Sequence, residues 1–395
     1  MEAEEEKANG EKGKVWEVRD LTKLFPIKAG FLASLLGREK FVHALNEVTF
    51  DIYDREILGI VGESGCGKTT CGRLLVRLEN PTKGEMYFRG QEIGSLKGKE
   101  LKAFRRNVQM VFQDPYESLN PRLTVFATVA EPLIVHGVGD TIEEREDLVA
   151  RALEYSELKP PEEFMYRYPH ELSGGQRQRV AISRTLVLRP QFIVADEPVS
   201  MLDVSIRAGI MNLMLNLRDE YGIPFMFISH DVSVTRYMSD RIAVMYLGGI
   251  VELGETEQVI KNPMHPYTEA LLSAVPVPDP KAKHGRVKIR GELPSPIELP
   301  SGCTFHPRCL YRKEICSKEK PMPKEVEKGH FVQCHFAGEL AIVRPDDEYV
   351  TERVCKSCNA TIKEGMPSVE CECGSVYHEE CAGKLEECAV CGKRL

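Results

Sequence analysis

The chain has 395 residues, of which 42% are hydrophobic and 28% are charged, a composition typical of folded water-soluble proteins. Its formal net charge of −8 argues against nucleic acid as the main partner, because nucleic-acid-binding domains carry an excess of basic residues. No apolar run approaches the roughly 20 residues that a membrane helix needs, and the N-terminus lacks a secretory signal. We therefore expect a cytoplasmic protein that reaches a membrane only through a partner.

The first 262 residues predict a tail followed by an α/β domain. Residues 1–14 begin MEAEEEK and predict an acidic, disordered tail. From residue 15 to about 262, short apolar runs such as EILGIVG, FIVAD and PFMFIS alternate with helical stretches. This alternation predicts an α/β fold with a largely parallel sheet. Between about 116 and 189 helical periodicity replaces the strand signals, which indicates an inserted helical subdomain.

The last third of the chain differs in composition. Residues 263–336 contain the proline-rich segments VPVPDP and LPSPIELP, which predict extended structure, and residues 337–395 predict a linker and a small module. Of the 13 cysteines, 11 lie between Cys303 and Cys391. In a reducing compartment such clustering indicates metal ligands rather than disulfides. The predicted fold is therefore an α/β domain followed by small cysteine-rich metal-binding modules.

The segment GESGCGKTT follows an apolar strand, opens a helix and fits the phosphate-loop pattern G-x-x-x-x-G-K-[ST]. Its backbone N–H groups are expected to cradle phosphate, with Lys68 at the β- and γ-phosphates and Thr69 on Mg²⁺. A glycine-rich turn without a ligand is the alternative, and the strand–loop–helix context favours nucleotide. The predicted contacts are Gly62, Glu63, Ser64, Gly65, Cys66, Gly67, Lys68, Thr69 and Thr70.

Two further segments predict the catalytic groups. The apolar run FIVADEP ends in Asp196, a candidate Mg²⁺ ligand, and Glu197, a candidate base that orients and deprotonates the attacking water. His230 ends another apolar strand and is a candidate γ-phosphate contact. Gln113 ends the run MVFQ and is expected to sense both Mg²⁺ and the water. With Lys68, these residues form the predicted catalytic set.

The segment LSGGQ, residues 172–176, places a serine three residues before a glutamine, as in a capping box at the start of a helix. A serine hydroxyl and bare glycine N–H groups at a helix start suit a terminal phosphate. With this segment, the chain resembles the ATP-binding cassette (ABC) family over about residues 15–336, on a P-loop fold with an antiparallel β subdomain. In that family two cassettes close head to tail, and each LSGGQ helix covers the ATP on its partner's phosphate loop. The resemblance implies nucleotide contacts from Leu172, Ser173, Gly174, Gly175, Gln176 and Asp203.

Within that family, the chain looks most like the ATP-binding subunits of oligopeptide and dipeptide importers, through FQDPYESLNPR and GELPSPIELPSGCTFHPRC. The resemblance implies ATP-driven dimerisation and hydrolysis coupled to uptake of peptides or related solutes at the cytoplasmic face of the membrane. The implied partners are a second ATPase subunit, identical or paralogous, two permeases and an extracellular solute-binding protein. By position Phe25 is implied to stack on adenine, with Phe31 and Phe41 as alternatives. The alternative function is a soluble ABC ATPase that acts on a protein or nucleic-acid complex through its C-terminal module.

Two cysteine sets remain. Cys303, Cys309, Cys316 and Cys334 suit zinc or an iron–sulfur cluster equally, and the importer resemblance implies a 4Fe–4S cluster. In the tail, CKSC, CEC, HEEC and CAVC resemble RING and PHD modules, which bind two Zn²⁺ ions and depend on them to fold. Its expected role is a stability or assembly cap, with protein recognition as the alternative. The implied ligands are Cys355, Cys358, Cys371, Cys373, His378, Cys381, Cys388 and Cys391.

Overall fold

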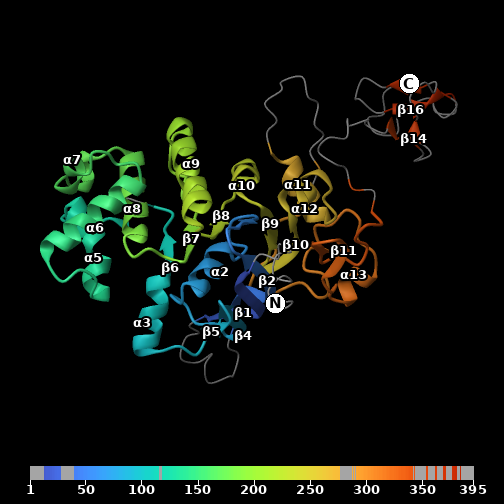
Figure 1. Ribbon diagram of the computed structural model, residues 1–395. Helices are drawn as coiled ribbons and strands as arrows, with labels where there is room; N and C mark the ends of the chain where they lie inside the picture. The colour runs from blue at the N-terminus through green and yellow to red at the C-terminus, as the bar shows by residue number, and fades with distance from the viewer. Residues whose placement is uncertain are drawn as a thin grey trace, which may run out of the picture. The chain divides into compact units, whose positions relative to one another are not determined.

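The computed structural model describes residues 13–27, 40–114, 118–275, 287, 289, 291–340 and 342, together with short stretches of the tail at 353–354, 361–362, 368–370, 376–379 and 383. The chain divides into two compact units, Met1–Val275 with Lys288–Ile342, and Pro276–Val287 with Val343–Leu395. Most of the predicted acidic tail lies outside the described residues, and the first strand already begins at Lys14. Figure 1 shows the elements of the chain.

A four-stranded antiparallel sheet has the order β2-β1-β4-β5. Its central strand carries Trp16, which is fully buried against the rings of Phe88, Phe104 and Phe192, with ring centroids 5.1, 6.2 and 5.5 Å away. Because Phe192 belongs to the other sheet, Trp16 joins the two sheets through one aromatic cluster. The strands are β1 (Lys14–Pro26), β2 (Phe41–Tyr53), β4 (Lys83–Phe88) and β5 (Gln91–Glu92).

The larger sheet has eight strands in the order β11-β12-β10-β9-β3-β8-β7-β6. The five strands from β9 to β6 are parallel, and the runs ILGIV and FIVAD are buried at every position. Helices cover one face, and a helix together with the four-stranded sheet covers the other. This arrangement confirms the predicted α/β fold. The strands are β3 (Ile57–Val61), β6 (Val108–Val111), β7 (Phe192–Asp196), β8 (Phe225–Ile228), β9 (Arg241–Tyr246), β10 (Gly249–Glu255), β11 (Lys324–Glu327) and β12 (His330–Val332).

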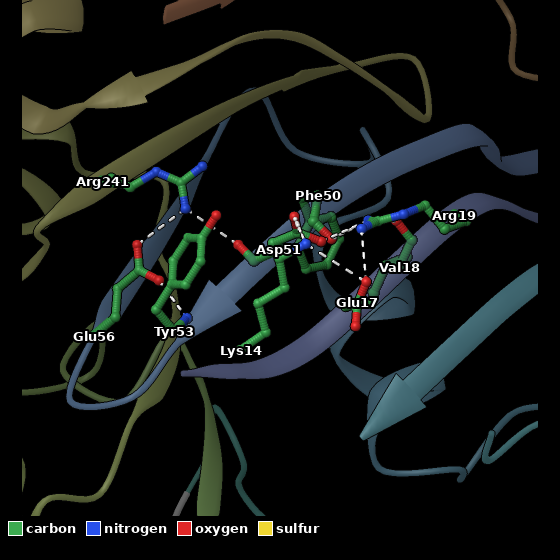
Figure 2. A network of polar contacts seen from close by, with 9 residues as sticks. All are labelled: Lys14, Glu17, Val18, Arg19, Phe50, Asp51, Tyr53, Glu56 and Arg241. Carbon is green, nitrogen blue, oxygen red and sulfur yellow. Dashed lines mark hydrogen bonds and ion pairs between the residues drawn. The ribbon is translucent and has the colours of Figure 1, made fainter. Parts of the chain in front are cut away.

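Besides the aromatic cluster of Trp16, an ion-pair network connects the two sheets. Figure 2 shows Arg241 of β9 donating to the main-chain oxygen of Asp51 at 3.2 Å and to Oε1 of Glu56 at 3.1 Å. Glu56 is only 2% exposed, and its other oxygen accepts from the backbone N–H of Tyr53. Burial raises the pKa of Glu56, and the Arg241 guanidinium opposes that rise. Arg241 is therefore the main counter-charge of a buried carboxylate.

The helices fall into two groups. Four of them form a cluster between β6 and β7, held together by apolar residues such as Leu133, Leu153 and Val180: α5 (Val125–His136), α6 (Ile142–Tyr155), α7 (Glu162–Met165) and α8 (Gly174–Leu186). The others are α2 (Lys68–Leu75), α3 (Gly98–Asn107), α9 (Val204–Tyr221), α10 (Val232–Met238), α11 (Thr256–Lys261), α12 (Pro266–Ser273) and α13 (Ile315–Lys318). In the described part of the chain, no helix has the length and apolar character that a membrane crossing requires.

The smaller unit contains two short antiparallel strand pairs. β13 (Arg353–Val354) pairs with β14 (Thr361–Ile362), and β15 (Ser368–Glu370) pairs with β16 (Val376–His378). The predicted zinc ligands of this unit lie outside the described side chains, since only the backbone of His378 is described.

Candidate nucleotide-binding site

The phosphate loop connects β3 to α2, as its sequence predicts. Two of its glycines are required by neighbouring backbone: a Cβ on Gly62 would lie 2.2 Å from the carbonyl oxygen of Met245, and one on Gly67 would lie 2.3 Å from that of Ala44. Both glycines also have positive φ, at 153° and 104°. Ser64 and Gly65 are exposed at the tip of the loop, and Thr70 follows in the first turn of α2. The chain's own sheet therefore shapes the loop.

Lys68 is turned toward the loop that carries it. Its Nζ donates to the carbonyl oxygens of Gly62 at 2.8 Å and Glu63 at 3.0 Å, and the residue is 6% exposed. The neighbouring thiol of Cys66 is buried, which raises its pKa and keeps it in the thiol form near neutral pH. A phosphate in the loop would offer the Lys68 ammonium a charged acceptor in place of two neutral ones.

A hydroxyl and a carboxylate meet beside the loop. Thr69 Oγ1 donates to Asp196 Oδ1 at 3.1 Å, which joins the start of α2 to the end of β7. Burial raises the pKa of Asp196, and nearby Glu197 raises it further. One carboxylate with one hydroxyl fits a Mg²⁺ ion that arrives with a nucleotide, because Mg²⁺ takes few protein ligands and completes its shell with phosphate and water.

Glu197 lies at the centre of the predicted catalytic set. Its Oε2 accepts from Gln113 Nε2 at 3.0 Å and contacts His230 Nδ1 at 3.1 Å. The backbone of Glu197 has φ of +47°, and its N–H donates to the carbonyl oxygen of Ile228 at 2.9 Å. A cleft of about 580 Å³ opens beside this group and is lined by Thr69, Gln113 and Asp196 among others. The structure therefore brings together candidate residues from four separated segments of the chain.

The LSGGQ segment forms the expected helix start. Ser173 is the N-cap of α8: its Oγ accepts from the N–H of Gln176 at 3.3 Å, and Gln176 Oε1 accepts from the N–H of Ser173 at 2.9 Å. Leu172 is buried, whereas Ser173 is exposed. The start of the helix therefore faces the outside of this chain at Ser173.

The two glycines of this segment have different reasons to lack a side chain. A Cβ on Gly175 would lie 2.4 Å from Cγ2 of Ile206 in α9, so packing within the chain requires this glycine. A Cβ on Gly174 would meet only Leu202, at 3.9 Å. The interpretation that an incoming phosphate accounts for both glycines is therefore corrected for Gly175.

The structure places the remaining predicted contacts, the adenine-stacking candidates and Asp203, away from the catalytic set or outside the described residues. Phe25 is half-buried on β1 with the Lys23 ammonium 4.6 Å from its ring, and Phe41 begins β2. Phe31 lies outside the described residues. Asp203 is exposed at the N-cap of α9, and its side chain makes no capping hydrogen bond. The roles of these residues stay predictions.

The four cysteines of residues 303–334 are free thiols that influence one another. Burial raises the pKa of Cys303 to about 12 and that of Cys309 to about 11, and the nearby Cys316 and Cys334 raise both pKa values further. Across the described ranges, however, no group of three or more His, Cys, Asp or Glu side chains has the arrangement to hold a metal ion. The predicted metal site at these cysteines is therefore not supported by the structure.

Sequence reasoning missed two residues that reach the phosphate loop. Arg308 makes two hydrogen bonds to the carboxylate of Glu63, and the hydroxyl of Tyr267 accepts from the Glu63 N–H. One signal was available: an acidic side chain in a loop that binds anions needs a nearby cation. The sequence could not say that the cation is 245 residues away.

Comparison with known proteins identifies the class. Residues 45–200 match the family described as ABC transporter, and residues 251–316 match the oligopeptide/dipeptide transporter C-terminal region. A solved structure titled as a dimeric post-hydrolysis state of the ATP-binding cassette MJ0796 bound to ADP and Pi is 32% identical, with a TM-score of 0.53, over 61% of this chain and 98% of that chain. With its phosphate loop and LSGGQ helix, this chain is an ABC ATPase.

Curated relatives define the particular family. The oligopeptide transport ATP-binding protein AppF of Bacillus subtilis is 49% identical over 325 residues, which cover 82% of this chain and 97% of the relative. The dipeptide transport ATP-binding protein DppF of Haemophilus influenzae is 47% identical over 315 residues, which cover 80% and 94%. The chain belongs to this family of ATP-binding subunits of oligopeptide and dipeptide ABC transporters. The alternative of a soluble ATPase acting on a protein or nucleic-acid complex is not supported.

Proposed function

We propose that this chain hydrolyses MgATP between two facing cassettes and couples the cycle to the uptake of peptides or related small solutes. The observation that carries the proposal is the convergence of Gln113 and His230 on one oxygen of Glu197, next to the pair Thr69 and Asp196. This arrangement supplies a fixed carboxylate base beside a cation site, which are the two groups that phosphoryl transfer to water needs.

In this proposal, backbone N–H groups of the phosphate loop and the Lys68 ammonium bind the β- and γ-phosphates. Thr69 and Asp196 hold Mg²⁺, which neutralises phosphate charge when bound. Glu197 orients and deprotonates the attacking water, while His230 and Gln113 hold the Glu197 carboxylate and contact the γ-phosphate and the metal. Phe25 stacks on adenine.

The second cassette supplies the opposite wall of the site. Ser173 is exposed at the start of α8, and the space at Gly174 is open within this chain. Both observations support the proposal that this helix start, with Leu172, Gly175, Gln176 and Asp203 supporting it, covers the nucleotide of a facing cassette. Phosphate release per chain that rises with protein concentration would agree with this model, and turnover independent of concentration would contradict it.

The transport partners follow from the family. The named relatives transport oligopeptides and dipeptides, which supports two separate permeases, a second ATPase subunit, an extracellular solute-binding protein and a position at the cytoplasmic face of the membrane. Co-purification from detergent-solubilised membranes tests this assembly. A protein that never associates with a hydrophobic partner would not be a transport subunit.

We extend the proposal to the metals. The spacing of Cys303, Cys309, Cys316 and Cys334, in a segment that overlaps the match to the oligopeptide/dipeptide transporter C-terminal region, supports a 4Fe–4S cluster there. The ligand pattern of the tail supports two Zn²⁺ ions in a RING- or PHD-like module. Anaerobic purification followed by iron, sulfide and zinc analysis tests both. Four irons lost in Cys309→Ser, and two zinc ions retained, are the expected results. Protein without iron or zinc would refute the respective site.

A further inference from the structure

The phosphate loop carries a carboxylate, and the C-terminal part of the unit neutralises it. Arg308 donates from Nη1 to Glu63 Oε2 at 2.8 Å and from Nη2 to Glu63 Oε1 at 3.2 Å. Arg308 is 8% exposed, so this two-pronged ion pair is shielded from water on the arginine side. Such paired hydrogen bonds fix orientation as well as charge.

A second residue from the same part of the chain holds the backbone of Glu63. The hydroxyl of Tyr267, in α12, accepts a hydrogen bond from the Glu63 N–H at 2.9 Å. Tyr267 is fully buried, and burial raises its pKa, so the hydroxyl keeps its proton. The Glu63 N–H is therefore occupied by the chain itself and anchors the loop.

Both contacts come from a packed aromatic cluster. The rings of Tyr246, Tyr267 and Phe305 lie with centroids 4.7 to 5.5 Å apart, and the Arg308 guanidinium lies 5.8 Å from the Tyr246 ring. The N–H of Arg308 donates to the carbonyl oxygen of Phe305 at 3.0 Å, which fixes the turn that presents the guanidinium. The same apolar core includes the end of β3, directly before the loop. The anchor is thus built entirely from residues of this chain.

The charge of Glu63 gives this contact a consequence for binding. A free carboxylate in the loop would repel the phosphates that the loop binds. Arg308 neutralises this charge and holds the Glu63 carboxylate in one orientation. We propose that Arg308, assisted by Tyr267, is a positioning residue of the phosphate loop, so that residues outside the nucleotide site set the affinity for MgATP. This inference rests on the proposed role of residues 62–70 in nucleotide binding.

The test uses the full chain and measures the Kd for MgATP, the KM and kcat of hydrolysis, and the thermal unfolding midpoint without nucleotide. For Arg308→Gln, we expect Kd and KM to rise about 10-fold, since one charged hydrogen-bonding partner is lost. Because the contact acts on the bound ground state and the transition state alike, kcat at saturating MgATP should stay within about twofold. Arg308→Lys keeps the positive charge but cannot make two parallel hydrogen bonds to Glu63, so its Kd and KM should lie between those of the wild type and those of Arg308→Gln. Tyr267→Phe removes the hydroxyl oxygen that accepts from the Glu63 N–H, so it should also raise Kd.

Rescue distinguishes positioning from simple stabilisation. In Arg308→Gln with Glu63→Gln, no carboxylate is left to neutralise, so most of the lost affinity should return. The matched control is Arg312→Gln, in the same segment and exposed, which should leave Kd unchanged.

Three outcomes would overturn the inference: a folded Arg308→Gln with unchanged Kd and KM, a lower unfolding midpoint as its only effect, or a double variant no better than the single one. Lys68→Ala separates this inference from the proposed function. If Lys68→Ala binds MgATP normally, the assignment of the phosphate loop fails. If it loses binding while the Arg308 variants keep it, only the positioning role fails.

Discussion

Gln113 and His230 meet at a single atom of Glu197. Gln113 Nε2 lies 3.0 Å from Glu197 Oε2, and His230 Nδ1 lies 3.1 Å from the same oxygen. Glu197 comes directly after β7, and Gln113 and His230 come two residues after the ends of β6 and β8, so three adjacent parallel strands bring these residues to one point. Carboxyl ends of parallel strands meet at one edge of a sheet, where ligand sites of this fold form.

Replacement of Glu197 separates binding from chemistry. Glu197→Gln keeps the size of the side chain and removes its capacity to accept a proton, so MgATP should still bind while hydrolysis falls by about 10² to 10⁴-fold. Because bound MgATP is not hydrolysed, the closed dimer of two cassettes should accumulate. Phosphate release measures turnover, and size-exclusion chromatography with MgATP measures this dimer. Wild-type turnover in this variant would remove Glu197 from its proposed role.

The two glycines of LSGGQ should respond in opposite ways. Gly175→Ala places a methyl group 2.4 Å from Ile206 Cγ2, and this overpacking should lower stability by about 1–3 kcal/mol. Gly174→Ala meets open space, so stability should stay the same or rise by up to about 1 kcal/mol, since alanine favours helix. Hydrolysis should fall in Gly174→Ala if a facing cassette approaches this position. Thermal unfolding without nucleotide and phosphate release measure both effects.

Removal of the Ile206 branch is the control for this pair. Ile206→Leu deletes the methyl group that Gly175→Ala would strike, so the double variant should regain part of the lost stability. If Gly175→Ala is as stable as the wild type, the packing explanation for this glycine is wrong.

Ser173→Arg tests the facing cassette directly. The serine is exposed on α8, so the larger side chain should fold without difficulty and leave MgATP binding to the phosphate loop of the same chain intact. Hydrolysis and nucleotide-dependent dimerisation should be lost, because the arginine occupies the space of the second cassette's phosphates. An unchanged hydrolysis rate would count against closure through this helix.

The buried ion pair between the sheets predicts a stability effect that depends on pH. Arg241→Ala leaves Glu56, 2% exposed, without its counter-charge and should cost about 3–5 kcal/mol near neutral pH. Burial already raises the pKa of Glu56 above its ordinary 4.5, and the variant raises it further. The stability that the variant loses relative to the wild type therefore grows as the pH rises past the raised pKa of Glu56 in the folded wild type, which lies above 4.5, and it becomes small below that pKa.

Arg236→Ala is the matched control for this prediction. It breaks an ion pair with Glu257 in which both side chains are about half exposed, 47% and 52%, and should cost only about 0–1 kcal/mol. Chemical unfolding at a series of pH values compares the two variants. Equal costs, or a cost for Arg241→Ala that is constant with pH, would show that Glu56 does not depend on Arg241.

Residues close in sequence made the centre of the site predictable. Lys68 and Thr69 lie within one phosphate loop, and the run before Asp196 and Glu197 is apolar at every position, so their placement at a strand end follows from local pattern. The parallel sheet then brings Gln113 and His230 to the same edge without any long-range information. The capping box of Ser173 and Gln176 was predictable for the same reason, since it spans four residues.

Contacts between distant segments were not predictable. Nothing in the neighbourhood of Glu63 points to Arg308 or Tyr267, because their meeting depends on the packing of α12 and a turn against the end of β3. The reason for Gly175 lies likewise in Ile206 of another helix. The segment HFV of β12 has three residues and no periodic pattern, so its place in the large sheet depends on β10 rather than on local propensity.

That short strand sets a limit on how far the protein can be trimmed. β12 pairs Val332 with Glu252 and Phe331 with Leu253 of β10, and β11 pairs with β12 in turn. An enzyme cut back before residue 324 would leave the outer N–H and C=O groups of β10 without partners, and bare sheet borders of this kind recruit one another into aggregates. The minimal working ATPase therefore extends well past the motifs that define it.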